Sequence, residues 1–207
     1  MEISQLLKDK QAVIFELDNV LFPEKDYLLQ VYYLFAQFIE YAEQKEAQPI
    51  LAFMRAEFEH SGSDWLFEKM AAQFKIDHKY QYNFDLLHQN ARLPLKLLLF
   101  QSMLNFLQEL VVNRIKIFIV TAGNPEQQLN KIKQTEWNGL EQYLTVYFAD
   151  ELKQSKAEIF RTYLPTIIYR LNRHLLSVQI ILTNNNPKQV ICRILSRLKF
   201  TNKGCLE

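Results

Sequence analysis

The sequence predicts an α/β fold, in which helices pack on a parallel sheet and a helical insertion follows the first strand. Four short apolar runs, rich in β-branched and aromatic residues, alternate later in the chain with segments of helical periodicity. The stretch between the first and second runs, residues 23–110, contains no comparable run and places apolar residues at helical spacing. With 207 residues, 49% of them hydrophobic, the chain can bury the core that such a fold requires.

The four apolar runs are predicted to be the strands of one sheet. Each has strand length and is followed by polar or turn-forming residues. They cover residues 12–17, 115–121, 143–149 and 178–183. Because parallel strands separated by helices bind ligands at their carboxyl ends, the residues that follow each run are the candidates for function.

The insertion is predicted to be a series of helices. Residues 26–46 carry a broad apolar stripe at helical spacing, and two further helices are expected at 48–59 and 64–75. The break at residues 61–63, Ser-Gly-Ser, separates those two helices, and Asp64 is the expected N-cap of the second.

Three more helices complete the expected order of elements. A helix over 94–112, with Pro94 at its start, leads back to the second strand. Helices over 125–137 and 155–175 lie between the later strands. A fifth strand is expected to be short, around residues 199–202, or missing.

Composition excludes several classes of protein. The net charge of +1 argues against a general electrostatic grip on nucleic acid. The two cysteines, Cys192 and Cys205, form neither a metal motif nor a disulfide framework, which fits a reducing compartment. The polar start lacks the features of a signal peptide, and no apolar stretch reaches the length of a membrane span. We therefore expect a cytoplasmic protein that does not engage membranes or specific nucleic acid.

Candidate functional residues follow the predicted strands in a definite order. The first strand ends in Glu16 and Asp18, two acids on the same side of an extended chain that can share one hard cation. The second ends in the hydroxyl of Thr121, followed by Ala122 and a turn.

The third and fourth predicted strands supply cationic and amide groups. Lys153 and Lys156 flank Ser155, which begins a helix with a capping-box pattern. The last strand is followed by Asn184 and then by Lys188. Acids, a hydroxyl, an ammonium and amides thus come in that order along the chain.

This order resembles the motifs of the haloacid dehalogenase (HAD)-like superfamily of phosphatases and related hydrolases. The segment from Phe15 to Glu24 resembles the first motif, and Ile119 to Pro125 resembles the second. The resemblance covers essentially the whole chain and implies a Rossmann-like core of residues 1–22 and 111–207. Residues 23–110 would form an all-helical cap domain.

The resemblance also assigns roles to the residues. Glu16 and Asp18 would stand at the nucleophile and acid/base positions, and Thr121 with Ala122 would hold the phosphoryl group. Either Lys153, which we favour, or Lys156 would be the lysine of the third motif. Mg²⁺ would be held by the metal ligands Glu16, Asp18 and Asn184.

Three positions depart from the family pattern. Glu16 stands where the family has a nucleophilic Asp, and a misplacement of ~1 Å can cost ~10²-fold in rate. Asn184 and Lys188 replace the acids of the fourth motif, so the Mg²⁺ cofactor is expected to bind weakly or not at all. The motifs are therefore degenerate in the groups that perform the chemistry.

Three functions are compatible with this pattern. The favoured one is a catalytically impaired phosphatase, a pseudoenzyme that retains a phosphate-binding site for a small phosphorylated metabolite. One alternative is a slow Mg²⁺-dependent phosphomonoesterase that uses Glu16 as its nucleophile. The other is a non-catalytic interaction protein built on the same scaffold.

Overall fold

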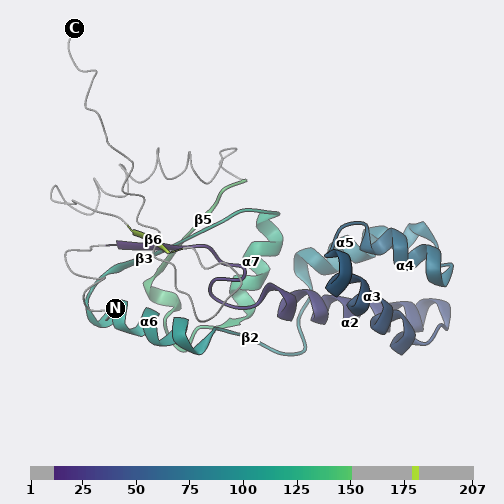
Figure 1. Ribbon diagram of the computed structural model, residues 1–207, viewed down its shortest axis with the longest axis horizontal. Coiled ribbons are helices and arrows are strands. Elements are labelled where there is room, and N and C mark those ends of the chain that lie inside the picture. The colour runs from purple at the N-terminus through teal and green to yellow at the C-terminus, as the bar shows by residue number, and fades with distance from the viewer. Residues whose placement is uncertain (1–11, 151–178, 182–207) are drawn as a thin grey trace, which may run out of the picture.

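The computed structural model describes residues 12–150 and 179–181, and these contain a parallel sheet with the strand order β5-β3-β1-β6. Each neighbouring pair in this sheet is parallel. The strands are β1 (Ala12–Phe15), β3 (Lys116–Thr121), β5 (Leu144–Phe148) and β6 (Gln179–Ile181). All four lie inside the predicted apolar runs, so the predicted α/β fold with a parallel sheet is confirmed (Figure 1).

Strands β1 and β3 are buried because their residues are apolar on both faces. Every residue of β1 is buried, and in β3 only Lys116 is exposed. Helix α6 (Gln101–Val112) packs against the sheet, where the ring of Phe106 meets that of Phe15 edge-on at 6.0 Å between centroids. Burial of such side chains is the main term that stabilises the sheet.

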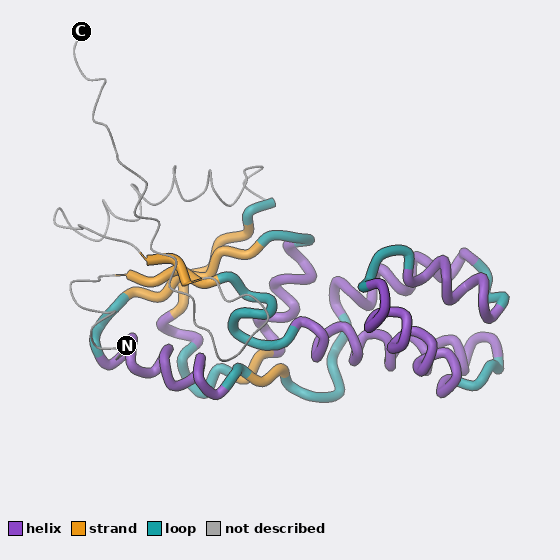
Figure 2. Tube along the Cα trace, viewed as in Figure 1, coloured by secondary structure: helices purple, strands orange, loops and turns teal. Residues whose placement is uncertain are grey.

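The segment after β1 is helical from Glu24 to Asn90. Its helices are α2 (Glu24–Glu43), α3 (Ala47–Ser61), α4 (Leu66–Phe74) and α5 (Gln81–Asn90), with a 3₁₀ turn, η1, at His78–Tyr80. They form a lobe beside the sheet, and α2 extends from the sheet into this lobe (Figures 1 and 2).

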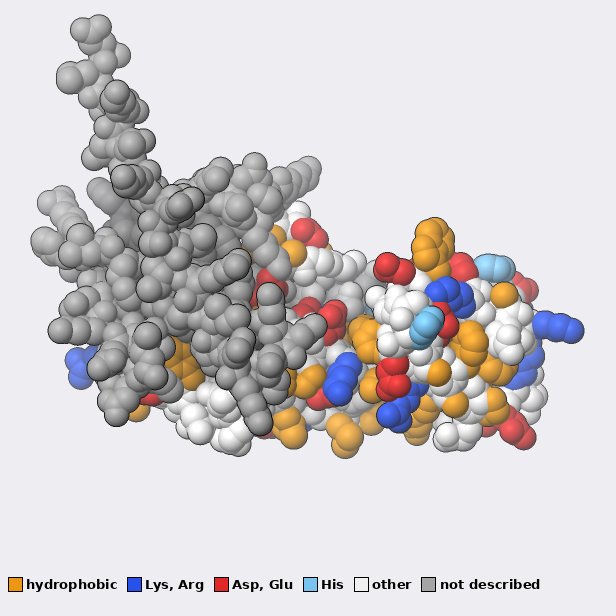
Figure 3. Space-filling model, in the orientation of Figure 1, with side chains coloured by type: hydrophobic (Ala, Val, Ile, Leu, Met, Phe, Trp, Pro, Cys, Tyr) orange, Lys and Arg blue, Asp and Glu red, His pale blue; other side chains and the backbone are white. Residues whose placement is uncertain are grey.

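Aromatic side chains fill the interior of the helical lobe. Phe35 lies edge-on to Phe84 at 5.0 Å and to Phe67 at 5.9 Å, which joins helices α2, α4 and α5. Tyr32, on the same face of α2, stacks on Phe84 at 6.2 Å. On the face seen in Figure 3, acidic and basic side chains are interspersed over this lobe.

Several predicted helix boundaries were wrong. Helix α4 begins at Leu66 rather than after an Asp64 N-cap, because Trp65 adopts a left-handed conformation (φ 57°) at the cap position. Helix α6 begins at Gln101 rather than at Pro94. The segment before it instead forms strand β2 (Leu97–Leu98).

A second, two-stranded sheet accounts for the late start of α6 and for the early end of the helix predicted over 125–137. Strand β2 pairs in parallel with β4 (Thr135–Glu136), which satisfies backbone groups that a helix would otherwise have bonded internally. Helix α7 (Pro125–Gln134) therefore ends three residues earlier than the predicted helix over 125–137.

The chain leaves the sheet for the helical insertion after Leu21 and returns at Phe100, and these two segments lie together. The N–H of Phe100 donates to the carbonyl of Leu21 at 2.8 Å, so the outgoing and returning segments are hydrogen-bonded. The domain boundaries at residues 22 and 111 stay a prediction, and α6 lies with the sheet. The predicted helix at 155–175 and the possible fifth strand at 199–202 fall outside the described residues.

Candidate active site

The loop after β1 presents two carboxylates separated by a buried leucine. Leu17 is fully buried, and its carbonyl accepts from the N–H of Leu21 at 3.0 Å. Asn19 adopts a left-handed conformation (φ 59°), and its N–H donates to the carbonyl of Phe22 at 2.9 Å. This tight turn fixes the backbone on both sides of Asp18.

Asp18 is held by two side chains of helix α7. Its Oδ2 accepts from Lys131 Nζ at 2.7 Å and from Gln128 Nε2 at 3.0 Å. The Lys131 side chain is 1% exposed and that of Asp18 is 15% exposed, so solvent screens this ion pair little. The orientation of the Asp18 carboxylate is therefore fixed from within the protein.

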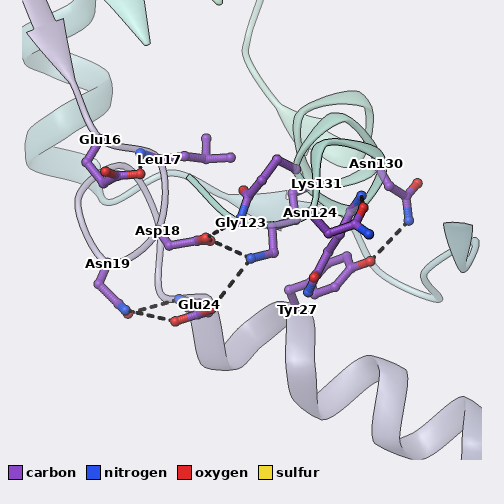
Figure 4. A network of polar contacts seen from close by, with 12 residues as sticks. Glu16, Leu17, Asp18, Asn19, Glu24, Tyr27, Gly123, Asn124, Asn130 and Lys131 are labelled. Atoms are coloured by element: carbon purple, nitrogen blue, oxygen red, sulfur yellow. Dashed lines mark hydrogen bonds and ion pairs between the residues drawn. The ribbon is translucent and has the colours of Figure 1, made fainter. Parts of the chain in front are cut away.

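Lys131 also joins the loop to helix α2. Its Nζ lies 3.6 Å from Glu24 Oε1 and 5.2 Å from the centroid of the Tyr27 ring. Figure 4 shows Asp18 and Glu24 directed toward this ammonium from two sides. One buried cation thus contacts the loop after β1 and the first turns of α2.

Lys131 and Gln128 were not among the site residues predicted from the sequence. The available signal was their i, i+3 spacing on a helix whose N-cap is well defined: Asn124 Oδ1 accepts from the N–H groups of Glu126 and Gln127. That spacing places both side chains on one face. Polar residues on a helix face are usually solvated, so the pattern did not indicate burial.

Glu16 lies on a different side of the loop. It is half-buried, and its Oε1 accepts from the N–H of Leu17 at 3.2 Å. Figure 4 shows the Asp18 carboxylate turned toward Lys131 and the Glu16 carboxylate away from that pair. The two predicted catalytic carboxylates therefore have different environments.

Thr121 lies at the carboxyl end of β3, next to the loop that carries Asp18. Since Phe15 pairs with Ile119, the strand ends of β1 and β3 meet at the same edge of the sheet. The turn that follows, including Ala122, is fixed by Asp150, whose Oδ2 accepts from the N–H of Gly123 at 2.9 Å. Thr121 and the loop that carries Asp18 therefore follow neighbouring strands at one edge of the sheet.

Three buried oxygens in this region have no hydrogen-bond partner among residues 12–150 and 179–181. They are Asp18 Oδ1, Thr121 Oγ1 and Gln128 Oε1. A Cβ at Gly123 would lie 3.3 Å from Gln128 Nε2, which places the Gln128 amide against the turn after Thr121. A buried polar group without a partner costs ~1–3 kcal/mol, so these oxygens are expected to bond to groups beyond the described residues or to a ligand.

Burial also shifts the pKa of two groups around Lys131. Burial raises the pKa of Tyr27; the hydrogen bond from Asn130 lowers it, and the charge of Asp18 raises it. Tyr27 therefore stays protonated, and its hydroxyl donates to the carbonyl of His88. Burial lowers the pKa of the His88 imidazole below its ordinary 6.5, partly offset by the hydrogen bond to Phe84, and the charge of Lys131 lowers it further.

The rest of the predicted site falls outside the described residues. This applies to the candidate lysines Lys153 and Lys156 and to Asn184 and Lys188. Within residues 12–150 and 179–181, no group of three or more His, Cys, Asp or Glu side chains is placed to hold a metal ion. Of the predicted ligands described, Asp18 already pairs with an ammonium and Glu16 points elsewhere, so these two carboxylates do not by themselves fit a divalent cation.

Comparison with known proteins gives neighbours by structure alone. No protein-family model and no curated protein matches the sequence. A hydrolase from Streptococcus pneumoniae TIGR4 has 12% identity and a TM-score of 0.47, over 86% of this chain and 84% of its own. The HAD-hydrolase YfnB from Bacillus subtilis, solved bound to magnesium, has 13% identity and a TM-score of 0.49, over 83% and 77%.

A dehalogenase is also among the similar structures. The L-2-haloacid dehalogenase from Xanthobacter autotrophicus, with chloropropionic acid covalently bound, has 15% identity and a TM-score of 0.40, over 83% of this chain and 69% of its own. The fold described above rests on the strand order of this chain itself. Among the described helices, none has the length and apolar character to cross a membrane.

Proposed function

We propose that this chain is a HAD-like protein that binds a small phosphorylated ligand and turns it over slowly or not at all. The observation that carries this proposal is the position of Thr121. Its hydroxyl is buried at the end of β3, near the strand end that leads into the Asp18 loop, and has no hydrogen-bond partner among the described residues. A hydroxyl at that edge is suited to donate to a phosphate oxygen.

The described charged groups near Thr121 do not by themselves offset the charge of a bound phosphate. Among the described residues nearby, Asp18 and Asp150 are acidic, and the ammonium of Lys131 is already paired. A phosphate dianion at Thr121 therefore needs the predicted lysine, Lys153 or Lys156, to offset its charge. This requirement makes the two lysines a specific part of the proposal.

Impaired turnover is proposed from the two carboxylates of the loop. Glu16 carries one methylene more than the nucleophile of the family it resembles, and phosphoryl transfer depends on placement and charge neutralisation. Oδ2 of Asp18, the predicted acid/base, already accepts two hydrogen bonds. Within the described part of the chain, only Oδ1 of this carboxylate remains without a partner.

Two measurements on the full chain test the proposal. Calorimetry with inorganic phosphate should show binding that Thr121→Val and a Lys153→Met, Lys156→Met double variant weaken. Hydrolysis of an aryl phosphate, with and without Mg²⁺, should stay well below the ~1–10³ s⁻¹ typical of enzymes.

The alternative functions predict other results in these two measurements. Turnover in that range by the unaltered chain, lost in Glu16→Gln, would establish Glu16 as a competent nucleophile. An absence of phosphate binding would leave the fold as a scaffold for interaction with other molecules. A gain of activity in Glu16→Asp would support the view that the extra methylene is what limits the reaction.

A further inference from the structure

The ammonium of Lys131 is enclosed by negatively polarised groups. It lies 2.7 Å from Asp18 Oδ2, 3.6 Å from Glu24 Oε1 and 5.2 Å from the centroid of the Tyr27 ring. The residue is fully buried. A buried ammonium is tolerated only when close partners compensate its charge, and here two carboxylates and an aromatic face do so.

Lys131 and its neighbours link three segments of the chain. Gln128 and Lys131, both on α7, hold Asp18 in the loop after β1. Asn130, between them in sequence, donates to the Tyr27 hydroxyl at 3.2 Å and to the carbonyl of Ala91 at 2.9 Å. The ammonium is therefore set in a rigid frame rather than on a free side chain.

We propose that Lys131 is the resident cation of this site: its fixed ammonium compensates Asp18 and Glu24, so that the site neither needs nor retains a divalent cation there. A cation approaching Asp18 would meet a positive charge bonded to Oδ2. This inference takes Asp18 as part of the proposed phosphate site, and Lys131 is its positioning residue. Its test uses metal binding alone and is therefore independent of whether phosphate binds.

Removal of the ammonium should turn this position into a cation site. In Lys131→Met, Asp18 and Glu24 keep their charges but lose their shared partner, and carboxylate oxygens are the ligands that hard divalent cations prefer. We expect the dissociation constant for Mn²⁺ at this position to fall by ~10-fold or more relative to the native chain. A structural role alone would lower stability without creating metal affinity.

The probe is Mn²⁺, observed as paramagnetic broadening of the backbone amides of Asp18, Glu24 and Gln128. In the native chain these amides should show no saturable broadening at ~1 mM Mn²⁺, a concentration that fills weak carboxylate sites. In Lys131→Met the broadening should saturate, and Glu24→Gln added to that variant should reduce the gain.

Two control variants separate charge from other effects. Lys131→Arg keeps a cation at the position and should gain no metal affinity. Lys133→Met removes an exposed lysine of the same helix and should leave Mn²⁺ binding as in the native chain.

Two results would overturn the proposal. One is saturable broadening of these amides in the native chain at low Mn²⁺. The other is a folded Lys131→Met variant that gains no affinity. If Lys131→Met does not fold, the native measurement decides alone: broadening refutes the resident cation and its absence supports it.

Discussion

Asn19 and Glu24 hydrogen-bond to each other in both directions. Asn19 Nδ2 donates to Glu24 Oε2 at 3.2 Å, and the N–H of Glu24 donates to Asn19 Oδ1 at 3.1 Å. Asn19 thereby satisfies a free N–H in the first turn of α2, although it lies outside the helix. This reciprocal contact joins the loop after β1 to the helix that carries the insertion.

Asn19→Ala should therefore destabilise the protein by ~1–2 kcal/mol, because it removes the cap and places a Cβ-bearing residue without local hydrogen bonds at φ 59°. Urea unfolding measures the loss. Asn19→Gly should cost less, since glycine accepts this conformation. Asn105→Ala, an exposed position on α6, is the matched control and should change the free energy of unfolding by less than ~0.5 kcal/mol.

Phe106 is expected to be the main anchor of α6 on the sheet. Phe106→Ala should lower the free energy of unfolding by ~3 kcal/mol or more, because the side chain is buried and meets Phe15 edge-on. Thermal or urea unfolding measures this, with Val112→Ala as control. Val112 is on the same helix but 80% exposed, so a comparable loss there would contradict the packing described.

Thr121→Val is expected to separate stability from ligand binding. It replaces a buried hydroxyl, which has no partner among the described residues, with a methyl group of similar shape. Stability should therefore stay unchanged or rise by up to ~1 kcal/mol while phosphate binding is weakened.

Thr135→Val is the control for that result. Thr135 is also buried, but its Oγ1 donates to the carbonyl of Lys131 at 2.8 Å, so the substitution should cost ~1 kcal/mol. Equal losses of stability in the two variants would mean that the Thr121 hydroxyl has a structural partner.

His88 should make the stability pH-dependent in the acidic range. Its pKa is lowered in the folded protein, so as pH falls through 6.5 the unfolded chain takes up a proton that the folded chain does not. The free energy of unfolding should therefore decrease as pH falls below 6.5, by at most ~1.4 kcal/mol per pH unit from this group. His88→Gln should flatten the curve, measured as the difference between variant and native at each pH.

The parallel sheet could be predicted because its strands are apolar on both faces. In residues 12–15 and 117–120 the β-branched and aromatic side chains leave no polar face, a pattern that only a buried strand or a buried helix explains. The short length of these runs favours strands. The neighbouring strand ends then brought Asp18 and Thr121 to one edge.

The partners of Asp18 could not be predicted in the same way. Lys131 and Gln128 are buried only because α7 packs its polar face against the β1 loop and α2, which is a tertiary arrangement without a local signal. Strands β2 and β4 have two residues each, too few to show a period. Trp65 adopts a left-handed backbone conformation, which bulky residues ordinarily avoid, so the later start of α4 could not be predicted.

The hydrogen bond between Phe100 and Leu21 has a consequence for how this chain can vary. It holds the two ends of the helical insertion together at its base, so the insertion resembles one closed loop attached to the sheet. The entropy of closing a loop rises only slowly with its length, by ~0.6 kcal/mol for each doubling. Helices can therefore be lengthened or shortened at the far end of the insertion, away from Glu24 and Tyr27, with little effect on the sheet, while Asp18 and Thr121 stay in place.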